Sequence, residues 1–185
     1  MEPIFSNNLC AAYLVELVHS FEQYFPNGFL GRTAIQKLTY FAQATGVPVP
    51  CSFEIYNYGP YSDQVKFNVD GLLADEILTD TSNNSCKYSN YRLMNINTFP
   101  QELGKRVAPH REQIERVVKN LGNFRPEQLE LIATLHFVHH RLESTLGKKP
   151  SEPTVIGEFH KIKRDKFDKG EVTGWYCALR NAGLV

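Results

Sequence analysis

The sequence predicts a mainly helical α+β protein that contains two winged-helix-like units of three helices each, joined by a further helix. Apolar residues recur at helical spacing in most segments, as Ile35, Leu38 and Ala42 do. Three short segments of strand-like composition, residues 53–58, 76–79 and 86–94, interrupt this pattern. Three helices followed by a hairpin with a polar tip is the order of a winged helix.

The first unit is expected to cover residues 1–98. Asn7 or Asn8 can cap a first helix that ends at residues 26–28, and a second helix spans residues 31–44. The strand at residues 53–58 is expected to stop at Gly59 and Pro60, because proline cannot donate a hydrogen bond to a neighbouring strand. Ser62 then begins the third helix, and the segments 76–79 and 86–94 form the wing.

The remaining residues predict a connecting helix and a second helical unit. Residues 99–125 form the connection, with a kink near Ala108 because Pro109 interrupts the helical hydrogen bonds. The unit at residues 126–185 starts a helix at Pro126, forms a second over residues 154–165 and begins a third at Asp168 or Gly170. We expect its last residues, 183–185, to continue as a short apolar strand.

Composition and charge narrow the class of protein. No apolar run among the 185 residues approaches the roughly 20 residues of a membrane span, and the N-terminus lacks the layout of a signal peptide. Residues 1–100 hold five Lys and Arg against nine Asp and Glu, whereas the rest hold fifteen against eleven. The four cysteines, Cys10, Cys51, Cys86 and Cys177, are widely separated, which indicates free thiols in a reducing cytoplasm.

Catalytic motifs are absent from the sequence. It has no Gly-x-Ser-x-Gly elbow, no phosphate-binding loop and no dinucleotide fingerprint. His136 and His140 stand at the spacing of a helical metal site, but no further ligand lies at a suitable offset. The alternative is that His136 is half-buried while His139 and His140 are exposed. We expect no enzyme, no cofactor and no metal. A small hydrolase using Cys51 or Cys177, or a metal protein, ranks third among the possible functions, after the two given below.

The winged-helix outline makes DNA binding the alternative function. The third helix offers Lys66 together with Asp63 and Asp70, which is too little positive charge for strong phosphate contact. Basic residues gather instead at residues 105–119 and 161–169, where we expect solvent-exposed helix faces.

The segment around Gly59 is the more distinctive feature. Tyrosine is amphipathic, stiff and common in recognition surfaces. Tyr56, Tyr58 and Tyr61 surround the rigid Gly-Pro pair, with Lys37 expected nearby. These tyrosines could form a contact surface, or two of them could be packed in the interior.

Two motifs support a family resemblance. Residues 35–43, Ile-Gln-Lys-Leu-Thr-Tyr-Phe-Ala-Gln, and the later Tyr58-Gly-Pro-Tyr-Ser62 resemble the signature of the Panacea antitoxin-domain family, which includes the SocA-like proteins. The match is closer to the uncharacterised YwgA-like relatives. The resemblance implies a non-enzymatic, mainly helical module that neutralises a toxin by contact or presents it to a protease. Whether the signature residues bind a partner or only stabilise the corner stays open.

We therefore expect a cytoplasmic, prokaryotic protein-interaction module, an antitoxin or proteolytic adaptor, with a protein partner that could be a toxin. A winged-helix transcriptional regulator that binds DNA is the alternative. The expected protein-binding residues are those of the two motifs: Gln36, Lys37, Tyr40, Tyr56, Tyr58, Gly59, Pro60 and Tyr61.

Overall fold

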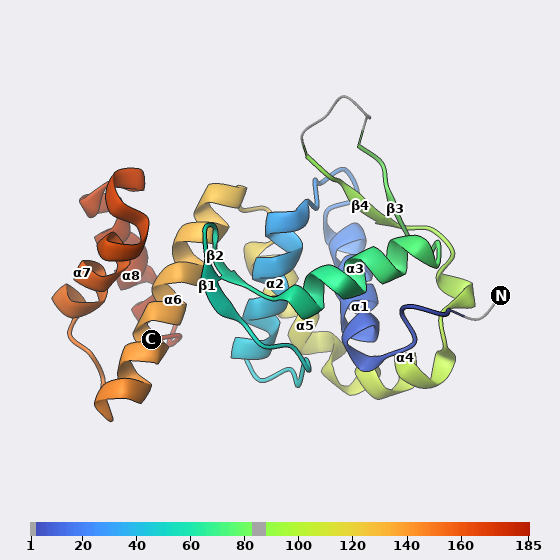
Figure 1. Cartoon of the computed structure of the whole chain (residues 1–185), viewed down its shortest axis with the longest axis horizontal. Helices are drawn as coiled ribbons and strands as arrows, with labels where there is room; N and C mark the ends of the chain where they lie inside the picture. Colours follow the sequence, from blue (N-terminus) through green and yellow to red (C-terminus); the bar gives the residue numbers. More distant parts are fainter. Residues whose placement is uncertain (1–2, 83–87) are drawn as a thin grey trace.

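The computed structural model describes residues 3–82 and 88–185 and is mainly helical α+β, as the sequence predicts (Figure 1). The helices of the described residues are α1 (Leu9–Tyr24), α2 (Arg32–Ala44), α3 (Asp63–Ala74), α4 (Gln101–Val107), α5 (Arg111–Leu121), α6 (Pro126–Leu146), α7 (Glu152–Lys163) and α8 (Lys169–Asn181). The strands form two antiparallel pairs, β1 (Glu54–Tyr56) with β2 (Gly59–Tyr61), and β3 (Leu78–Asp80) with β4 (Tyr91–Leu93).

Several helices begin where their capping residues predict. The side chains of Asn8 and Ser62 accept hydrogen bonds from the backbone N–H groups of Ala11 and Val65, and so satisfy donors that the first turn leaves unpaired. Asp168 does the same for α8. Local polar chemistry therefore determines these boundaries.

The first hairpin corrects the prediction that Gly59 and Pro60 end a single strand. Both residues belong to β2, which pairs with β1 in the register Glu54↔Tyr61, Ile55↔Pro60 and Tyr56↔Gly59. Pro60 is tolerated because a two-stranded sheet consists only of edge strands, where a missing donor need not break a ladder. The reversal therefore lies at Asn57 and Tyr58, before the Gly-Pro pair.

The second hairpin follows α3, as expected for a wing. Its strands are shorter than predicted, and residues 86 and 87 of the expected second strand lie outside the described residues. The hairpin is attached to the connection between α1 and α2, since Tyr91 N–H donates to the carbonyl oxygen of Leu30 at 3.0 Å and Arg92 donates to that of Gly28.

The predicted connecting helix is interrupted at the expected place. A 3₁₀ turn at Ala108–His110 separates α4 from α5, at the position of Pro109. Both helices pack against α1, and α5 also packs against α2, so Val107, Ile114 and Val118 join the same core as the first two helices. The proposed division at residues 98 and 125 stays a prediction.

The last three helices form one end of the molecule, with α7 and α8 outermost (Figure 1). Helix α6 packs against α2 on one side and against α7 and α8 on the other. The predicted strand after Gly183 is wrong: Leu184 N–H returns to the carbonyl oxygen of Leu179 at 3.0 Å and ends α8. None of the described helices has the length and apolarity needed to cross a bilayer.

Candidate functional site

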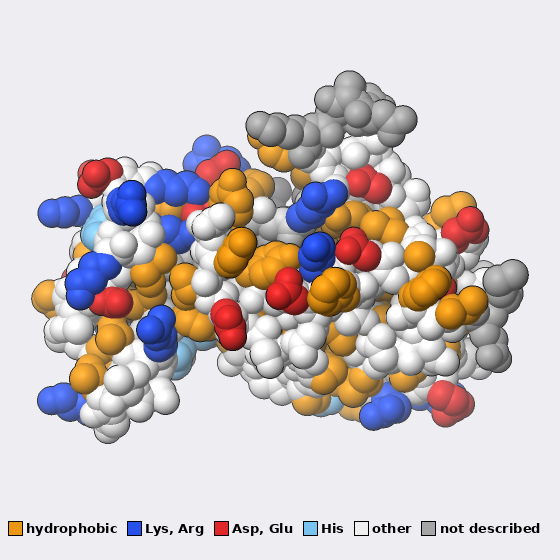
Figure 2. All heavy atoms as spheres, viewed as in Figure 1, with side chains coloured by type: hydrophobic (Ala, Val, Ile, Leu, Met, Phe, Trp, Pro, Cys, Tyr) orange, Lys and Arg blue, Asp and Glu red, His pale blue; other side chains and the backbone are white. Residues whose placement is uncertain are grey.

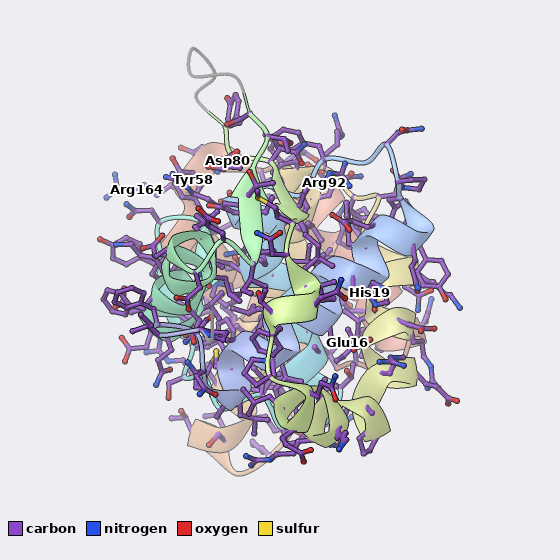
Figure 3. All side chains as sticks on the ribbon, turned by 90° about the vertical axis from the view of Figure 1, so that its right-hand side faces the viewer. Glu16, His19, Tyr58, Asp80, Arg92 and Arg164 are labelled. Carbon is purple, nitrogen blue, oxygen red and sulfur yellow. The ribbon has the colours of Figure 1, made fainter. Side chains whose placement is uncertain are left out.

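The most distinctive surface is the β1–β2 hairpin, residues 54–61, which we call the tyrosine hairpin. The side chains of Tyr56 and Tyr58 are strongly exposed, at 64% and 62%, whereas Tyr61 is half-buried. The rings of Tyr56 and Tyr61 lie 5.7 Å apart between centroids. Figure 3 shows Tyr58 at the upper edge of the molecule, on the same side as Asp80 and away from Glu16. The hairpin thus presents aromatic surface to the solvent.

Gln36 fixes the end of this hairpin from helix α2. Its side-chain nitrogen donates to the carbonyl oxygen of Ser62 at 2.9 Å, and its side-chain oxygen accepts from Ser62 N–H at 2.9 Å. The amide therefore pairs with one backbone residue as a neighbouring strand would. Because Gln36 is buried, water cannot replace these bonds without exposing the core.

Lys37, the next residue of α2, holds the second strand of the hairpin, β2. Its Nζ donates to the carbonyl oxygen of Pro60 at 2.6 Å, and the side chain is fully buried. Burial lowers the pKa of Lys37 to about 7, with Glu130 opposing the shift and Lys163 adding to it. A neutral amine keeps N–H donors, so the bond to Pro60 survives loss of the proton.

Gly59 lets the hairpin lie directly on helix α6. A Cβ atom at this position would stand 2.5 Å from the hydroxyl oxygen of Thr134, which is too close for any real side chain. The φ angle of Gly59 is +85°, in the region that favours glycine. The glycine is thus required both by its conformation and by the close approach.

Tyr40 lies deeper on the same helix and joins α2 to α6. Its hydroxyl is 2.7 Å from Nδ1 of His136, and both side chains are buried. Burial lowers the pKa of His136 to about 3, with smaller effects from His140 and His139. Burial likewise raises the pKa of Tyr40. This pair is a neutral hydrogen bond between two helices.

The turn of the tyrosine hairpin is held by the end of α7. Lys163 Nζ donates to the carbonyl oxygen of Asn57 at 2.8 Å and to Oε1 of Glu130 at 2.8 Å. Lys166 Nζ also contacts Glu130, at 2.7 Å, and lies 5.1 Å from the ring centroid of Tyr58. The buried Glu130 thus receives one buried ammonium group, from Lys163, and one more exposed ammonium group, from Lys166. Through Lys163, α7 reaches a turn more than a hundred residues earlier.

These contacts divide the eight predicted residues into two groups. Gln36, Lys37 and Tyr40 are buried, and Gly59 and Pro60 are buried in the hairpin they fix, so these five residues expose very little surface to a macromolecular partner. Tyr56, Tyr58 and, in part, Tyr61 remain at the surface. The structure brings all eight into one region.

A groove of about 1250 Å³ adjoins the tyrosine hairpin. It runs between the hairpin, the start of α2, α3, the end of the β3–β4 hairpin and the start of α6. Figure 2 shows hydrophobic side chains in the middle of one face of the molecule, bordered by both signs of charge. The aromatic lining residues are Phe29, Tyr58, Tyr61, Tyr88 and Tyr91, and the charged ones are Arg32, Lys37, Lys66, Asp70, Glu127, Glu130 and Lys166.

The histidines of α6 differ from the prediction. His136 and His139 are both buried, and His140 alone among them is exposed. The reason is that α2 and α8 cover these two side chains: His136 packs against Tyr40 and Phe41 of α2, and His139 Nδ1 lies 2.9 Å from the hydroxyl of Tyr176 in α8. Within residues 3–82 and 88–185, no group of three or more His, Cys, Asp or Glu side chains is arranged to hold a metal.

Two features of the site were not predicted from the sequence. Lys163 belongs to a basic run that was expected to face the solvent, yet it is buried against Glu130. The one available signal was Glu130 itself, a carboxylate within the apolar run of residues 129–133. Cys10 and Cys51, which are widely separated in the sequence, lie side by side in the core.

A scan of the sequence against protein-family models found no match, and a search of curated proteins found none either.

Proposed function

We propose that this chain is a non-enzymatic protein-interaction module that binds a partner protein through the tyrosine hairpin and the adjoining groove. The observation that carries the proposal is that Tyr56 and Tyr58 project from a hairpin whose backbone is held by buried side chains of α2 and α7. Aromatic residues dominate many binding hot spots, and a surface ordered in advance costs less conformational entropy on binding.

The resemblance to the Panacea antitoxin-domain family supports a more specific role. The Gln-Lys-Leu and Tyr-Gly-Pro motifs that carry the resemblance are the residues that lock the tyrosine hairpin in place. We propose an antitoxin or proteolytic adaptor acting in a prokaryotic cytoplasm, with a toxin as the partner. In this proposal the buried residues of the two motifs shape the surface, and the exposed Tyr56 and Tyr58 touch the partner.

Affinity capture from the native host tests the proposal. We expect the wild-type chain to retain a partner that the double variant Tyr56→Ala/Tyr58→Ala loses. Leu146→Ala is the matched control, because Leu146 is a large exposed apolar residue at the far end of α6. Equal recovery of the partner by the wild type and the double variant would exclude the tyrosine hairpin as the binding surface.

Growth rescue tests the antitoxin role separately. The host gene adjacent to this one is induced in a heterologous bacterium with and without the chain. We expect the adjacent product to arrest growth and the wild-type chain, but not the double variant, to restore it. Absence of arrest, or arrest without rescue, would argue for a different partner.

Duplex DNA is the competing ligand in the same set of experiments. The exposed side of α3 carries Asp63 and Asp70 beside Lys66, which does not favour contact with phosphates. We expect no shift of duplex DNA at low salt. A shift that weakens steeply as salt is added would favour the regulator instead.

A further inference from the structure

Two thiols from distant parts of the chain meet in the core. The Sγ atoms of Cys10 and Cys51 lie 2.6 Å apart, although 41 residues separate them in sequence. This distance is only about 0.5 Å longer than a disulfide bond. Both residues are free cysteines, exposed by 4% and 6% respectively.

The backbone around Cys51 is fixed, so the meeting does not depend on a freely moving loop. Gln43 Nε2 donates to the carbonyl oxygens of Val49 and Cys51 at 2.8 and 2.6 Å. Cys10 lies in the first turn of α1, which packs against α2. Both partners therefore belong to well-packed parts of the molecule.

A small molecule can approach the pair from one side. Cys51 lines a hollow of about 400 Å³ together with Phe53 and Phe137, and the half-exposed His140 also borders it. Cys10 does not line this hollow. The arrangement gives Cys51 the outer position and Cys10 the inner one.

We propose that Cys10 and Cys51 are a reversible oxidation site that a peroxide converts into an intramolecular disulfide. The Cys51 thiolate attacks one peroxide oxygen; an S–O bond forms, the O–O bond breaks, and the other oxygen leaves as hydroxide or alkoxide. Cys10 then attacks the Cys51 sulfur, forming the S–S bond and expelling hydroxide, which takes the Cys10 proton and leaves as water. Each sulfur loses one electron and the peroxide gains two.

The electrostatics of the pair agree with this order. Hydrogen bonding to Cys10 lowers the pKa of the Cys51 thiol, against the effect of burial, and Ser62 lowers it further. The pKa of the Cys10 thiol is raised by its hydrogen bond to Cys51 and by burial. Since the thiolate is the nucleophile, Cys51 reacts first and Cys10 resolves the product.

The disulfide would tie α1 to the segment that leads into the tyrosine hairpin. Cys51 stands three residues before Glu54, the first residue of β1. The cross-link limits the freedom of the unfolded chain, so we expect oxidation to raise the thermal midpoint of unfolding.

The test uses the full chain with Cys86→Ser and Cys177→Ser, which leaves the pair as the sole thiols. The folded protein is treated with hydrogen peroxide, then unfolded with N-ethylmaleimide and weighed by mass spectrometry. We expect a loss of two hydrogens, no alkylation, a Cys10–Cys51 peptide after proteolysis, and reversal by dithiothreitol. Alkylation of both thiols after peroxide, or a sulfinic acid at Cys51 in place of the disulfide, would overturn the proposal.

A second variant separates the two roles. With Cys10→Ser added, Cys51 has no resolving thiol, and we expect its sulfenic acid to be trapped by dimedone at a rate close to that of disulfide formation. With Cys51→Ser added instead, we expect Cys10 to react at least tenfold more slowly. Equal rates for the two variants would contradict the assignment of Cys51 as the attacking thiol. Circular dichroism of each variant before oxidation verifies that it is folded.

Discussion

Lys37 Nζ lies 2.6 Å from the carbonyl oxygen of Pro60, and it makes this contact from the fully buried interior of the protein. An ammonium group in such a place is costly, because burial disfavours the charged form. The pKa of about 7 expresses that cost and gives the residue a measurable signature.

The first prediction concerns the pH dependence that Lys37 imposes. The pKa of Lys37 is about 7 in the folded chain and near the usual lysine value of 10.5 in the unfolded chain, so the unfolded chain binds more protons between these values. The free energy of unfolding should therefore rise with pH, by about 2 kcal/mol between pH 7 and pH 9 from this residue. Lys37→Met should remove this rise, as urea titrations of both proteins at the two pH values would detect. Parallel pH profiles would contradict it.

The second prediction concerns acid and His136. The pKa of His136, about 3, lies below the usual histidine value of 6.5, so the unfolded chain binds the extra proton and stability falls as the pH drops below 6.5. Lowering the pH to 5 should cost about 2 kcal/mol through this residue. In His136→Gln, which keeps a polar partner for Tyr40, that loss should disappear. His139 titrates in both proteins, so the difference between the two urea titrations isolates His136; an identical acid sensitivity would refute the assignment.

The third prediction concerns Gly59 and Thr134. Gly59→Ala forces a methyl group against the Thr134 hydroxyl at a positive φ, and we expect a loss of about 3 kcal/mol in thermal or urea unfolding. Gly147→Ala is the matched control, since Gly147 also has a positive φ but nothing within 4 Å, and it should cost about 1 kcal/mol. Adding Thr134→Ala should restore part of the stability to Gly59→Ala. Equal losses of stability in Gly59→Ala and Gly147→Ala would show that the close approach of Gly59 to Thr134 does not contribute to the loss.

The fourth prediction concerns the carboxylate of Glu130. Glu130→Gln leaves the buried Lys163 without its counter-ion, which should cost about 3 kcal/mol in urea unfolding. The comparison is Glu152→Gln, which breaks the more exposed pair with Arg180 and should cost less than about 1 kcal/mol. Similar effects at the two positions would mean that Lys163 finds another partner in the variant.

The helices and their limits could be read from local sequence, because the forces that set them act over a few residues. Apolar spacing located α2 and α3, the side chains of Asn8 and Ser62 marked two helix starts, and Pro109 marked the interruption between α4 and α5. The position of Lys37 near the three tyrosines was also expected, and its bond to the carbonyl oxygen of Pro60 places it beside them.

The partners of the buried polar groups could not be predicted in the same way. Lys163 and Asn57 are separated by 106 residues and Tyr40 and His136 by 96, and no local spacing encodes such pairs. The same applies to Cys10 and Cys51. The two-stranded nature of the tyrosine hairpin was missed because proline was judged as it would behave in a central strand.

The bond from Lys163 to the turn at Asn57 has a practical consequence for mapping experiments. A fragment that stops before α7 would keep every residue of the tyrosine hairpin yet lose the ammonium group that anchors its tip. We expect such a fragment to bind the partner weakly although it contains all the contact residues. A negative binding result would then wrongly assign the contact to the missing helices. Point substitutions in the intact chain, and not deletions, are the way to locate the surface.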